Sequence, residues 1–296
     1  MEDGYYRNSW GGTFTVTEPY SVLMTVYYAC DAAQFDTALQ SMERQTVPPD
    51  DIVIFCDGTP SEELRQVISI HQTHCGPRLQ VLQSDVPLGI GGATQKGLAA
   101  CKYDLVAKMD ADDIALPYRC EHQLQRFREL PTLAVLGGEI EEFQSDPSKV
   151  DTVRKVPYSD AEIRRFAKRR QPFNNMTVMY RKSAVLSVGG YRPLRRNEDY
   201  DLYVRLLHHG YAAENLPEIL VKARVDSDAY ARRGSLQTFA GTVRSRFYAL
   251  RIGFSSPFDF IFCFLGAFLM LILPTALRKQ IYRKFLRSRN EKPKHP

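Results

Sequence analysis

The sequence predicts an α/β protein with a mostly parallel, doubly wound sheet, and three observations carry that prediction. From Tyr20 onward, short apolar segments typical of strands alternate with amphipathic segments typical of helices. The 296 residues are 44% hydrophobic and 25% charged, which is ordinary for a globular chain and excludes disordered, collagen-like and coiled-coil proteins. The βαβαβ order of the first half places successive strands parallel in one sheet. Ligands of such sheets bind beyond the carboxyl ends of the strands.

The first half carries the clearest periodicity. Its expected strands, rich in β-branched and other apolar residues, are Tyr20–Tyr28, Asp51–Cys56, Leu79–Leu82 and Tyr103–Met109. Its expected helices have apolar residues at helical spacing and cover Phe35–Met42, Glu62–His71 and Ala93–Cys101. A glycine-rich stretch, Leu88–Gly92, precedes the third helix, and we expect it to form a loop on the ligand-binding edge of the sheet.

The second half is less regular. We expect strands at Leu133–Ile140 and Thr177–Tyr180, and helices at Ser159–Arg170 and Tyr200–His209. The only linker-like change in composition is at Arg224–Ser235. The expected organisation is an N-terminal extension (1–19), one α/β domain (20–235) with halves at about 20–115 and 116–235, and a C-terminal helical region (236–296).

Charge is distributed unevenly along the chain, which has a formal net charge of +5. Residues 275–296 hold eight Lys or Arg and one acid, so residues 1–274 have 31 basic and 33 acidic side chains. A slightly acidic body lacks the basic surface that a nucleic-acid-binding domain needs, and we expect no nucleic-acid partner. Residues 1–20 contain one Arg and no apolar core segment, so we expect no signal peptide and a cytoplasmic protein.

The six cysteines are scattered and include no Cys-x-x-Cys pair, so we expect free thiols in a reducing compartment. His71, His74 and Cys75 lie close together but have no second cluster of metal ligands in the sequence. We therefore expect a polar loop before Gly76 and Pro77 rather than a metal site.

Acidic residues follow the fourth expected strand directly. Asp110, Asp112 and Asp113 stand at a strand-to-loop turn, where one carboxylate can bind Mg²⁺ or Mn²⁺ while another holds a sugar hydroxyl. A purely structural alternative stays open, in which Asp112 or Asp113 caps a helix that runs to Arg128.

A second acidic pair, Glu198 and Asp199, precedes the expected helix at Tyr200–His209. Either residue can act as a general base toward an acceptor hydroxyl, or both can simply be favoured by the dipole of the helix. The chain has no P-loop, no dinucleotide fingerprint after an early strand and no Gly-x-Ser-x-Gly nucleophile motif.

Taken in order, these features resemble glycosyltransferase family 2, and within it the amylovoran-biosynthesis type. The matching segments are Val22–Tyr27, Gln45–Pro48, Asp57–Gly58, Asp104–Pro117, Pro172–Met179, Val188–Tyr191 and Glu198–Arg205. The resemblance covers roughly residues 20–235. It implies a GT-A fold, with a Rossmann-like nucleotide-binding half and a mixed sheet, and an inverting, metal-dependent transfer from a UDP-sugar.

The resemblance also implies roles for single residues. Thr25 and Tyr27 would line the uridine pocket, and Asp57 would hold the uracil. Lys96 would lie near the nucleotide, and Asp110 would bind the ribose or the donor sugar. The metal ion, Mn²⁺ or Mg²⁺, would be held by Asp112 with support from Asp113. Asp199 would be the catalytic base and Glu198 its acidic neighbour.

The expected function is hexose transfer, from UDP-galactose or UDP-glucose, to a diphospholipid-linked saccharide. The product would be a β-glycoside in an O-antigen, capsule or exopolysaccharide. Two alternatives stay open: a membrane-tethered nucleotide-sugar-binding scaffold built on the same fold, and a sugar nucleotidyltransferase. The second would need a glycine-rich basic loop after the first strand, where the sequence instead reads Tyr27–Asp31.

The C-terminal region carries a fourteen-residue apolar run, Phe260–Leu273, with Lys and Arg following from Arg278. Fourteen helical residues span roughly 21 Å, which is less than the ~30 Å of a hydrocarbon core. Basic groups beside an apolar run suit anionic lipid, so we expect shallow attachment to the inner face of the plasma membrane. The alternative is a helix buried in the protein core.

Overall fold

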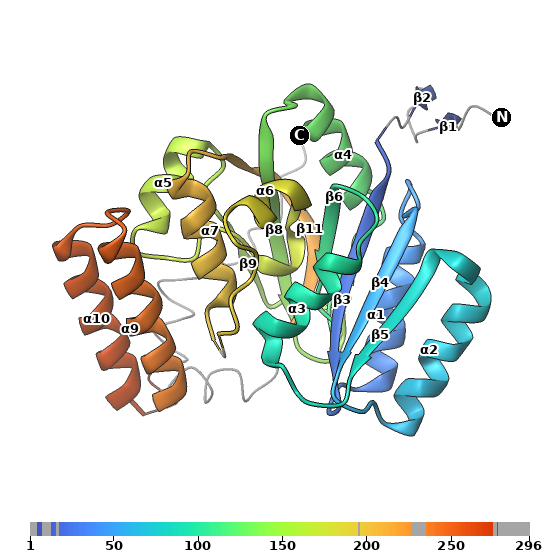
Figure 1. Ribbon diagram of the computed structural model, residues 1–296, viewed down its shortest axis with the longest axis horizontal. Helices are drawn as coiled ribbons and strands as arrows, with labels where there is room; N and C mark the ends of the chain where they lie inside the picture. Colours follow the sequence, from blue (N-terminus) through green and yellow to red (C-terminus); the bar gives the residue numbers. More distant parts are fainter. Residues whose placement is uncertain are drawn as a thin grey trace.

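The four strands expected in the first half form a continuous parallel ladder. The structure is a computed structural model that describes residues 5–7, 13–15, 18–194, 196–225, 235–274 and 277. Strand β3 pairs in parallel with both β4 and β6, and β4 pairs in parallel with β5 (Figure 1). The described strands are β1 (Tyr5–Arg7), β2 (Thr13–Thr15), β3 (Tyr20–Tyr27), β4 (Asp51–Asp57), β5 (Leu79–Ser84), β6 (Leu105–Met109), β7 (Ile114–Ala115), β8 (Leu133–Phe143), β9 (Thr152–Arg154), β10 (Met179–Arg181) and β11 (Ala212–Arg224). The prediction of a parallel, doubly wound first half is confirmed.

The second half converts this ladder into a mixed sheet. The strand order is β5-β4-β3-β6-β10-β8-β11-β7, with β9 paired to β8. β10 lies antiparallel between β6 and β8, whereas β8 and β11 are parallel to each other. β1 and β2 form a separate two-stranded sheet.

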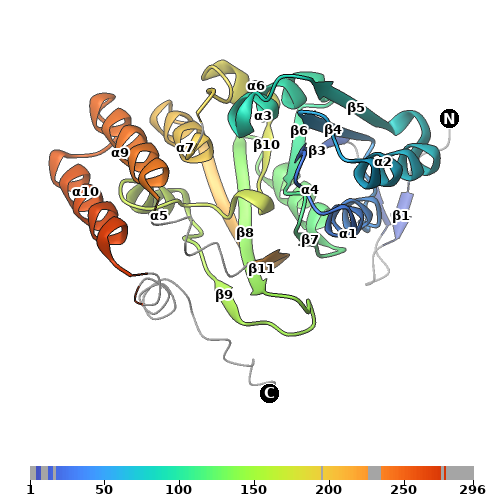
Figure 2. The ribbon, with the colours of Figure 1, turned by 90° about the horizontal axis from the view of Figure 1, so that it is seen from below.

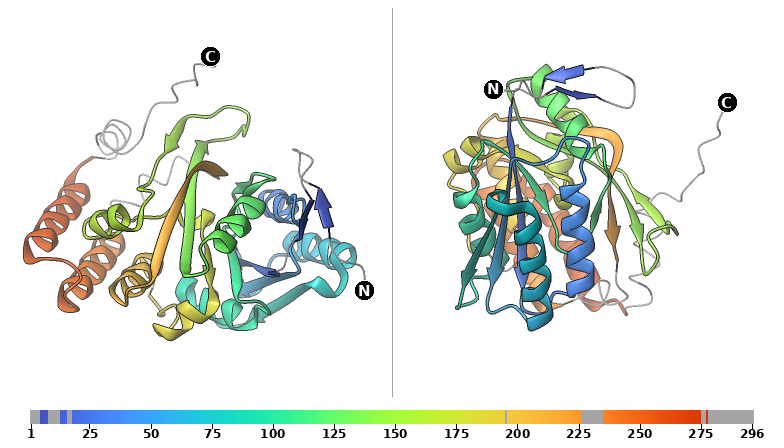
Figure 3. Two further views of the ribbon diagram at one scale, coloured as in Figure 1. Left: turned by 90° about the horizontal axis from the view of Figure 1, so that it is seen from above. Right: turned by 90° about the vertical axis from the view of Figure 1, so that its right-hand side faces the viewer.

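Helices cover both faces of the large sheet (Figure 3). The described helices are α1 (Ala32–Glu43), α2 (Glu62–Cys75), α3 (Gly89–Ala100), α4 (Arg119–Glu129), α5 (Asp160–Ala167), α6 (Lys182–Ser187), α7 (Glu198–His208), α9 (Leu236–Arg251) and α10 (Pro257–Ile272), with short 3-10 turns at Gly76–Arg78 and Asn175–Thr177. Apolar side chains of α1, α2 and α4 pack into one core with the sheet. Those of α3, α5, α6 and α7 form a second core on the opposite face.

Several expected boundaries are wrong. The glycine-rich stretch is not a loop, because α3 already begins at Gly89. The helix expected at Ser159–Arg170 ends at Ala167. The alternative that Asp112 or Asp113 caps a helix is also wrong. β7 follows the Asp110–Asp113 turn and α4 begins only at Arg119, so neither residue caps that helix.

The segment expected as a polar loop at His71–Cys75 is instead the last turn of α2. Asp36 and Glu43 of α1 supply polar partners for the side chains of this turn. The two ring nitrogens of the buried His71 lie 2.8 Å from Asp36 Oδ1 and 2.7 Å from Glu43 Oε1. The sequence could not show these partners, because they lie about 30 residues away.

The C-terminal helices α9 and α10 lie side by side at the end of the molecule farthest from β5 (Figures 1 and 2). α9 packs against α7, where Ala249 joins Tyr200 and Val204 in a small apolar cluster. The Arg246 guanidinium lies 3.6 Å from the centre of the Tyr200 ring. The apolar run is therefore not a core helix: most of the α10 surface is exposed. Across the described residues, we find no helix with the length and apolarity needed to cross a bilayer.

Candidate active site

Three neighbouring parallel strands end at one edge of the sheet with polar residues. Tyr27 and Asp57 are register partners at the ends of β3 and β4, and Asp110 directly follows β6. Tyr27 is 54% exposed and Thr25, two residues earlier, is half-buried. This convergence is what the parallel order predicts, because the carboxyl ends of adjacent parallel strands share one edge. We call this edge the catalytic rim.

Asp57 holds the start of α3. Its Oδ1 accepts a hydrogen bond from the Leu88 backbone N–H at 2.6 Å, and its Oδ2 accepts one from the Gly89 N–H at 3.0 Å. Gly89 has φ +74°, a conformation that favours glycine. A carboxylate on the first N–H groups of a helix satisfies donors that have no partner within the helix. Lys96 lies two turns further along α3. Its side chain is exposed and forms no hydrogen bond or ion pair with a described residue.

Lys108 is buried beneath the rim and forms an ion pair with Asp110. Burial alone would lower the pKa of Lys108, but the carboxylates of Asp110, Glu198 and Asp199 raise it above its usual value. The ammonium is thus the shared counter-charge of three carboxylates that come from two distant parts of the chain. The backbone here is fixed from below, since the buried Arg119 donates from Nη2 to the Lys108 carbonyl at 2.7 Å.

Asp112 and Asp113 differ sharply in environment. Asp112 is exposed, whereas Asp113 is buried and accepts a hydrogen bond from the Arg224 backbone N–H at 2.7 Å. Burial raises the pKa of Asp113 well above its usual value, and the nearby charges of Asp112 and Asp110 raise it further. Asp113 therefore joins the acidic turn to the end of β11.

Glu198 and Asp199 open α7 on the far side of the rim. Asn197 precedes them with φ +59° and provides no side-chain cap. Burial, followed by the charge of Asp199, raises the pKa of Glu198 to about 8. Burial also raises the pKa of Asp199, although the Tyr200 N–H donates to its Oδ1 at 2.7 Å. Both carboxyls therefore bind a proton more readily than they would in water.

Two residues of this arrangement have no role in the sequence analysis. Gln171 donates from Nε2 to Asp199 Oδ2 at 2.6 Å and fixes the direction of that carboxylate. Lys108 had a visible signal, a single Lys within a strand whose other residues are apolar. Gln171 had none, because its contact joins residues 28 positions apart.

The rim therefore brings Asp110, Glu198 and Asp199 together around Lys108, and joins Asp112 to them through Asp113. It does not bring Lys96 into contact with these acids. The acidic turn is not a closed metal cage. Within the described ranges, the only three His, Cys, Asp or Glu side chains with donor atoms within 4.8 Å of one another are Glu43, His74 and Cys75, on α1 and α2. The acidic turn instead offers carboxylate oxygens at an exposed site, a donor set suited to Mg²⁺ or Mn²⁺ that takes further ligands from a phosphate substrate.

Comparison with known proteins gives consistent matches. The model of the family described as glycosyl transferase family 2 matches residues 21–194. An uncharacterized glycosyltransferase of Haemophilus influenzae is 36% identical over 90% of this chain and 99% of its own length. The UDP-Gal:alpha-D-GlcNAc-diphosphoundecaprenol beta-1,3-galactosyltransferase of Escherichia coli is 31% identical over 92% of this chain and 98% of its own. The amylovoran biosynthesis glycosyltransferase AmsE of Erwinia amylovora is 35% identical over 72% and 79%.

Solved structures share the fold at low sequence identity. The mannosyltransferase PcManGT of Pyrobaculum calidifontis, solved with GDP-Man and Mn²⁺, superposes with a TM-score of 0.62 at 16% identity, covering 89% of this chain and 73% of its own. Residues 1–349 of S. aureus TarS, solved with UDP, superpose with a TM-score of 0.57 at 16% identity, covering 90% and 70%.

Proposed function

Because the chain belongs to glycosyl transferase family 2 and has the GT-A fold, we propose that it moves a hexose from a UDP-sugar to a lipid-linked saccharide. The acceptor would be a diphospholipid-linked saccharide in the synthesis of a bacterial surface polysaccharide, and galactose or glucose is the proposed hexose. The E. coli relative, which matches along almost its whole length, is named for galactose transfer to such an acceptor. The single observation that carries the proposal is the meeting of Asp110, Glu198 and Asp199 on the catalytic rim.

The proposed reaction is a single displacement. Asp199 removes the proton of an acceptor hydroxyl while Gln171 holds its carboxylate in place. The hydroxyl oxygen forms a bond to the anomeric carbon, and the bond from that carbon to the diphosphate oxygen breaks on the opposite side. UDP leaves, and an α-linked donor gives a β-glycoside. The charge of Asp199 raises the pKa of its neighbour Glu198.

The donor would lie along the ends of β3, β4 and β6. Thr25 and Tyr27 would line the uridine pocket, Asp57 would hold the uracil, and Asp110 would bind the ribose or the donor sugar. Lys96 would lie near the nucleotide. Asp57 would then have two roles, because the residue that holds the start of α3 is also the register partner of Tyr27 at the end of the ladder.

A divalent cation fits the acidic turn by its donor set. Asp112, supported by the buried Asp113, would hold Mn²⁺ or Mg²⁺. When bound, such an ion offsets the negative charge that grows on the departing diphosphate. The chain's own part is to place a positive charge beside the acids, and the buried Lys108, paired with Asp110, supplies it.

We also propose that the protein attaches to the cytoplasmic face of the plasma membrane through α10. Six apolar residues at helical spacing, between 45% and 67% exposed, form a continuous strip that we call the α10 stripe: Phe258, Ile261, Phe262, Leu265, Leu269 and Ile272. Such a strip suits the interfacial region of a bilayer. The basic residues from Arg278 onward lie outside the described residues, but their charge suits anionic lipid.

A transfer assay tests the proposed function. Purified full-length protein would be incubated with Mn²⁺, a diphospholipid acceptor mimic and a panel of UDP- and GDP-sugars. We expect one UDP-hexose to give a β-linked product, recognised by its anomeric proton coupling. Asp199→Asn should lower turnover by ~10²–10⁴ while leaving UDP-sugar affinity near that of the wild type. Turnover within a few-fold of wild type would exclude Asp199 as the base, and absence of transfer from every donor would favour a binding scaffold.

A further inference from the structure

The segment that follows α5 connects the exposed helix α10 to the proposed catalytic base. Arg169 Nε lies 2.5 Å from Asp259 Oδ1 of α10, and its guanidinium lies 5.3 Å and 5.0 Å from the ring centres of Phe258 and Phe262. Only two residues later, Gln171 donates to Asp199. One short stretch of chain thus contacts two rings of the α10 stripe at one end and the catalytic rim at the other.

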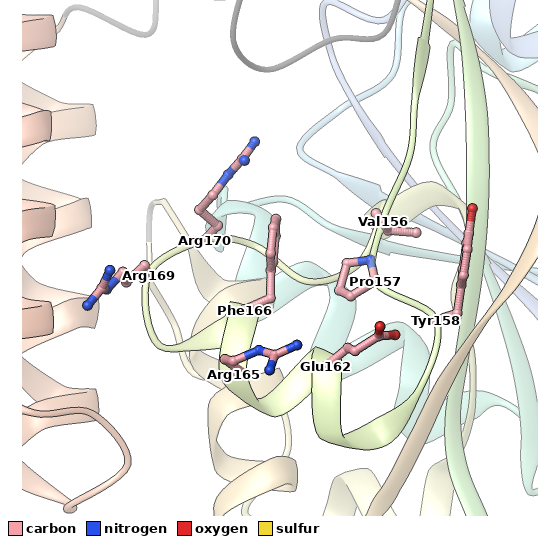
Figure 4. Close-up of a pocket in the computed structure, with 8 residues that line it drawn as sticks. All are labelled: Val156, Pro157, Tyr158, Glu162, Arg165, Phe166, Arg169 and Arg170. Carbon is pink, nitrogen blue, oxygen red and sulfur yellow. The ribbon is translucent and has the colours of Figure 1, made fainter.

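A pocket of about 490 Å³ opens beside this segment (Figure 4). Arg165 and Phe166 of α5 form one wall, and Pro157 and Tyr158 lie across from them. Val156, Glu162, Arg169 and Arg170 complete the lining. The pocket therefore combines aromatic and apolar surface with the side chains of three arginines, of which Arg169 turns its guanidinium toward α10.

The charges of this pocket favour an anion. Residues 160–170 hold five basic and two acidic side chains. Asp160 forms an ion pair with Arg164. Glu162, the acid in the lining, is part of a capping box: it accepts hydrogen bonds from the Ser159 N–H at 3.1 Å and the Ser159 hydroxyl at 2.9 Å. Asp259, the carboxylate nearest to Arg169, is occupied by the ion pair with Nε of that residue.

Arg165 is the clearest anion ligand of the three. Its side chain is exposed and forms neither a hydrogen bond nor an ion pair with the residues that the structure describes. A guanidinium offers a planar fork that matches phosphate oxygens in pairs, which makes arginine the residue best suited to such a group.

We propose that this pocket binds the diphosphate of the lipid-linked acceptor, an inference that rests on the proposed function. A diphospholipid-linked sugar has three parts in fixed order: a sugar hydroxyl, a diphosphate and an apolar chain. The chain presents three matching features around one short segment: Asp199 with Gln171, the arginine-lined pocket, and the α10 stripe at Phe258 and Phe262. Bound this way, the diphosphate sets the distance between the bilayer and the reacting hydroxyl.

Steady-state kinetics of full-length Arg165→Gln test the proposal. The acceptor would be a water-soluble sugar diphosphate ester with a short alkyl tail, which removes any need for a membrane. We expect KM for this acceptor to rise by roughly ten-fold or more, as for the loss of a charge-assisted hydrogen bond. KM for the UDP-sugar should change by less than about two-fold, and Arg165→Lys should recover part of the loss because the charge is kept. The matched control is Arg128→Gln, which removes an exposed arginine from α4.

The outcomes separate the possible sources of the anion. If Arg165→Gln keeps the wild-type KM for the soluble acceptor but loses binding to phosphatidylglycerol vesicles, the pocket binds lipid headgroups and the proposal is wrong. If KM for acceptor and donor rise together, the pocket serves the nucleotide and the proposal is again wrong. If the wild type transfers no sugar to any acceptor, the proposed function itself fails and this inference fails with it.

Discussion

The residue that links the two halves of the site is Lys108. A lysine is expensive to bury unless carboxylates neutralise it, and the cluster of three acids around it would be equally unfavourable without the ammonium. Removing the ammonium would leave these carboxyls without their shared counter-charge, whereas loss of one acid still leaves Lys108 two others.

Glu198 shows the stability cost of this arrangement. Its pKa is raised from 4.5 to about 8 by burial and by Asp199. Between these two pH values the folded state binds more protons than the unfolded state, so the free energy of unfolding falls as pH rises. We expect Glu198→Gln to have nearly the wild-type Tm at about pH 4 and a Tm at least ~2 °C higher at about pH 8.

Thermal unfolding across this pH range measures the effect. Glu63→Gln is the control, because Glu63 is exposed and the hydrogen bond of its own backbone N–H lowers the pKa of its carboxyl. This control should show no gain in stability at alkaline pH. A Tm difference for Glu198→Gln that is equal at every pH would contradict the assignment of a raised pKa.

Asp112 supplies a second prediction at this scale. Because Asp112 is exposed and begins no helix, Asp112→Ala should leave the fold stable. Transfer should fall by at least ~10²-fold, as for the loss of a group that stabilises transition-state charge. Mn²⁺-dependent binding of UDP, measured by calorimetry, should weaken as well. Full activity of this variant in the presence of EDTA would exclude a metal role for Asp112.

At the residue scale, local sequence patterns reveal the acids that follow strands but not the contacts between residues far apart in the chain. The acids at positions 110 and 113 were expected at a strand end, and the structure places them there. The hydrogen bond from Gln171 to Asp199 joins residues 28 positions apart, and the one from the Arg224 N–H to Asp113 joins residues 111 positions apart. No local pattern encodes contacts of that kind.

At the scale of elements, the exposed strip of α10 is the least ordinary feature. Large apolar side chains are exposed along one side of this helix, while Phe264 and Phe268 turn toward Phe239 of α9. Asp259 fixes the first turn, since its carboxylate accepts from Ser256 and pairs with Arg169. The helix is therefore anchored at its start and along one side, with the α10 stripe left uncovered.

Charging the stripe tests membrane attachment. We expect the double variant Ile261→Glu, Leu265→Glu to bind anionic vesicles at least ~10-fold more weakly, because two large side chains no longer enter the interface. Its Tm should stay close to that of the wild type, since both positions are more than half exposed. Vesicle co-sedimentation is the measurement, and Ile70→Glu, an exposed position on α2, is the control. Unchanged binding by the double variant would contradict attachment through α10.

The element that the sequence concealed most completely is β11. Pro217 and Glu218 interrupt its apolar pattern and suggest a turn rather than a thirteen-residue strand. The structure accommodates them by a shift of register between Leu216 and Ile219 in the pairing with β8. Such a bulge depends on the partner strand, so it has no signature in a single sequence.

At the scale of the whole molecule, the two halves differ in how directly sequence determines them. The first half joins neighbouring βα units by short connections, and its periodicity is therefore readable. The second half depends on β10 inserting antiparallel between β6 and β8, and on β11 returning to β8. Local patterns predict its strands and helices one by one but not their partners.

The pairing of β8 with β11 has a consequence for how the chain acquires activity. It closes a loop of about 70 residues, and such long-range parallel pairing is slow compared with the formation of neighbouring βα units. Glu198 and Asp199 lie inside that loop, and Asp113 is fixed only when the end of β11 arrives. A nascent chain that has completed β3 to β6 therefore has the strands proposed to hold the nucleotide but not yet the proposed base, Asp199. Under the proposed function, ordered assembly of this kind would keep an incomplete chain from hydrolysing the sugar nucleotide before the site has formed.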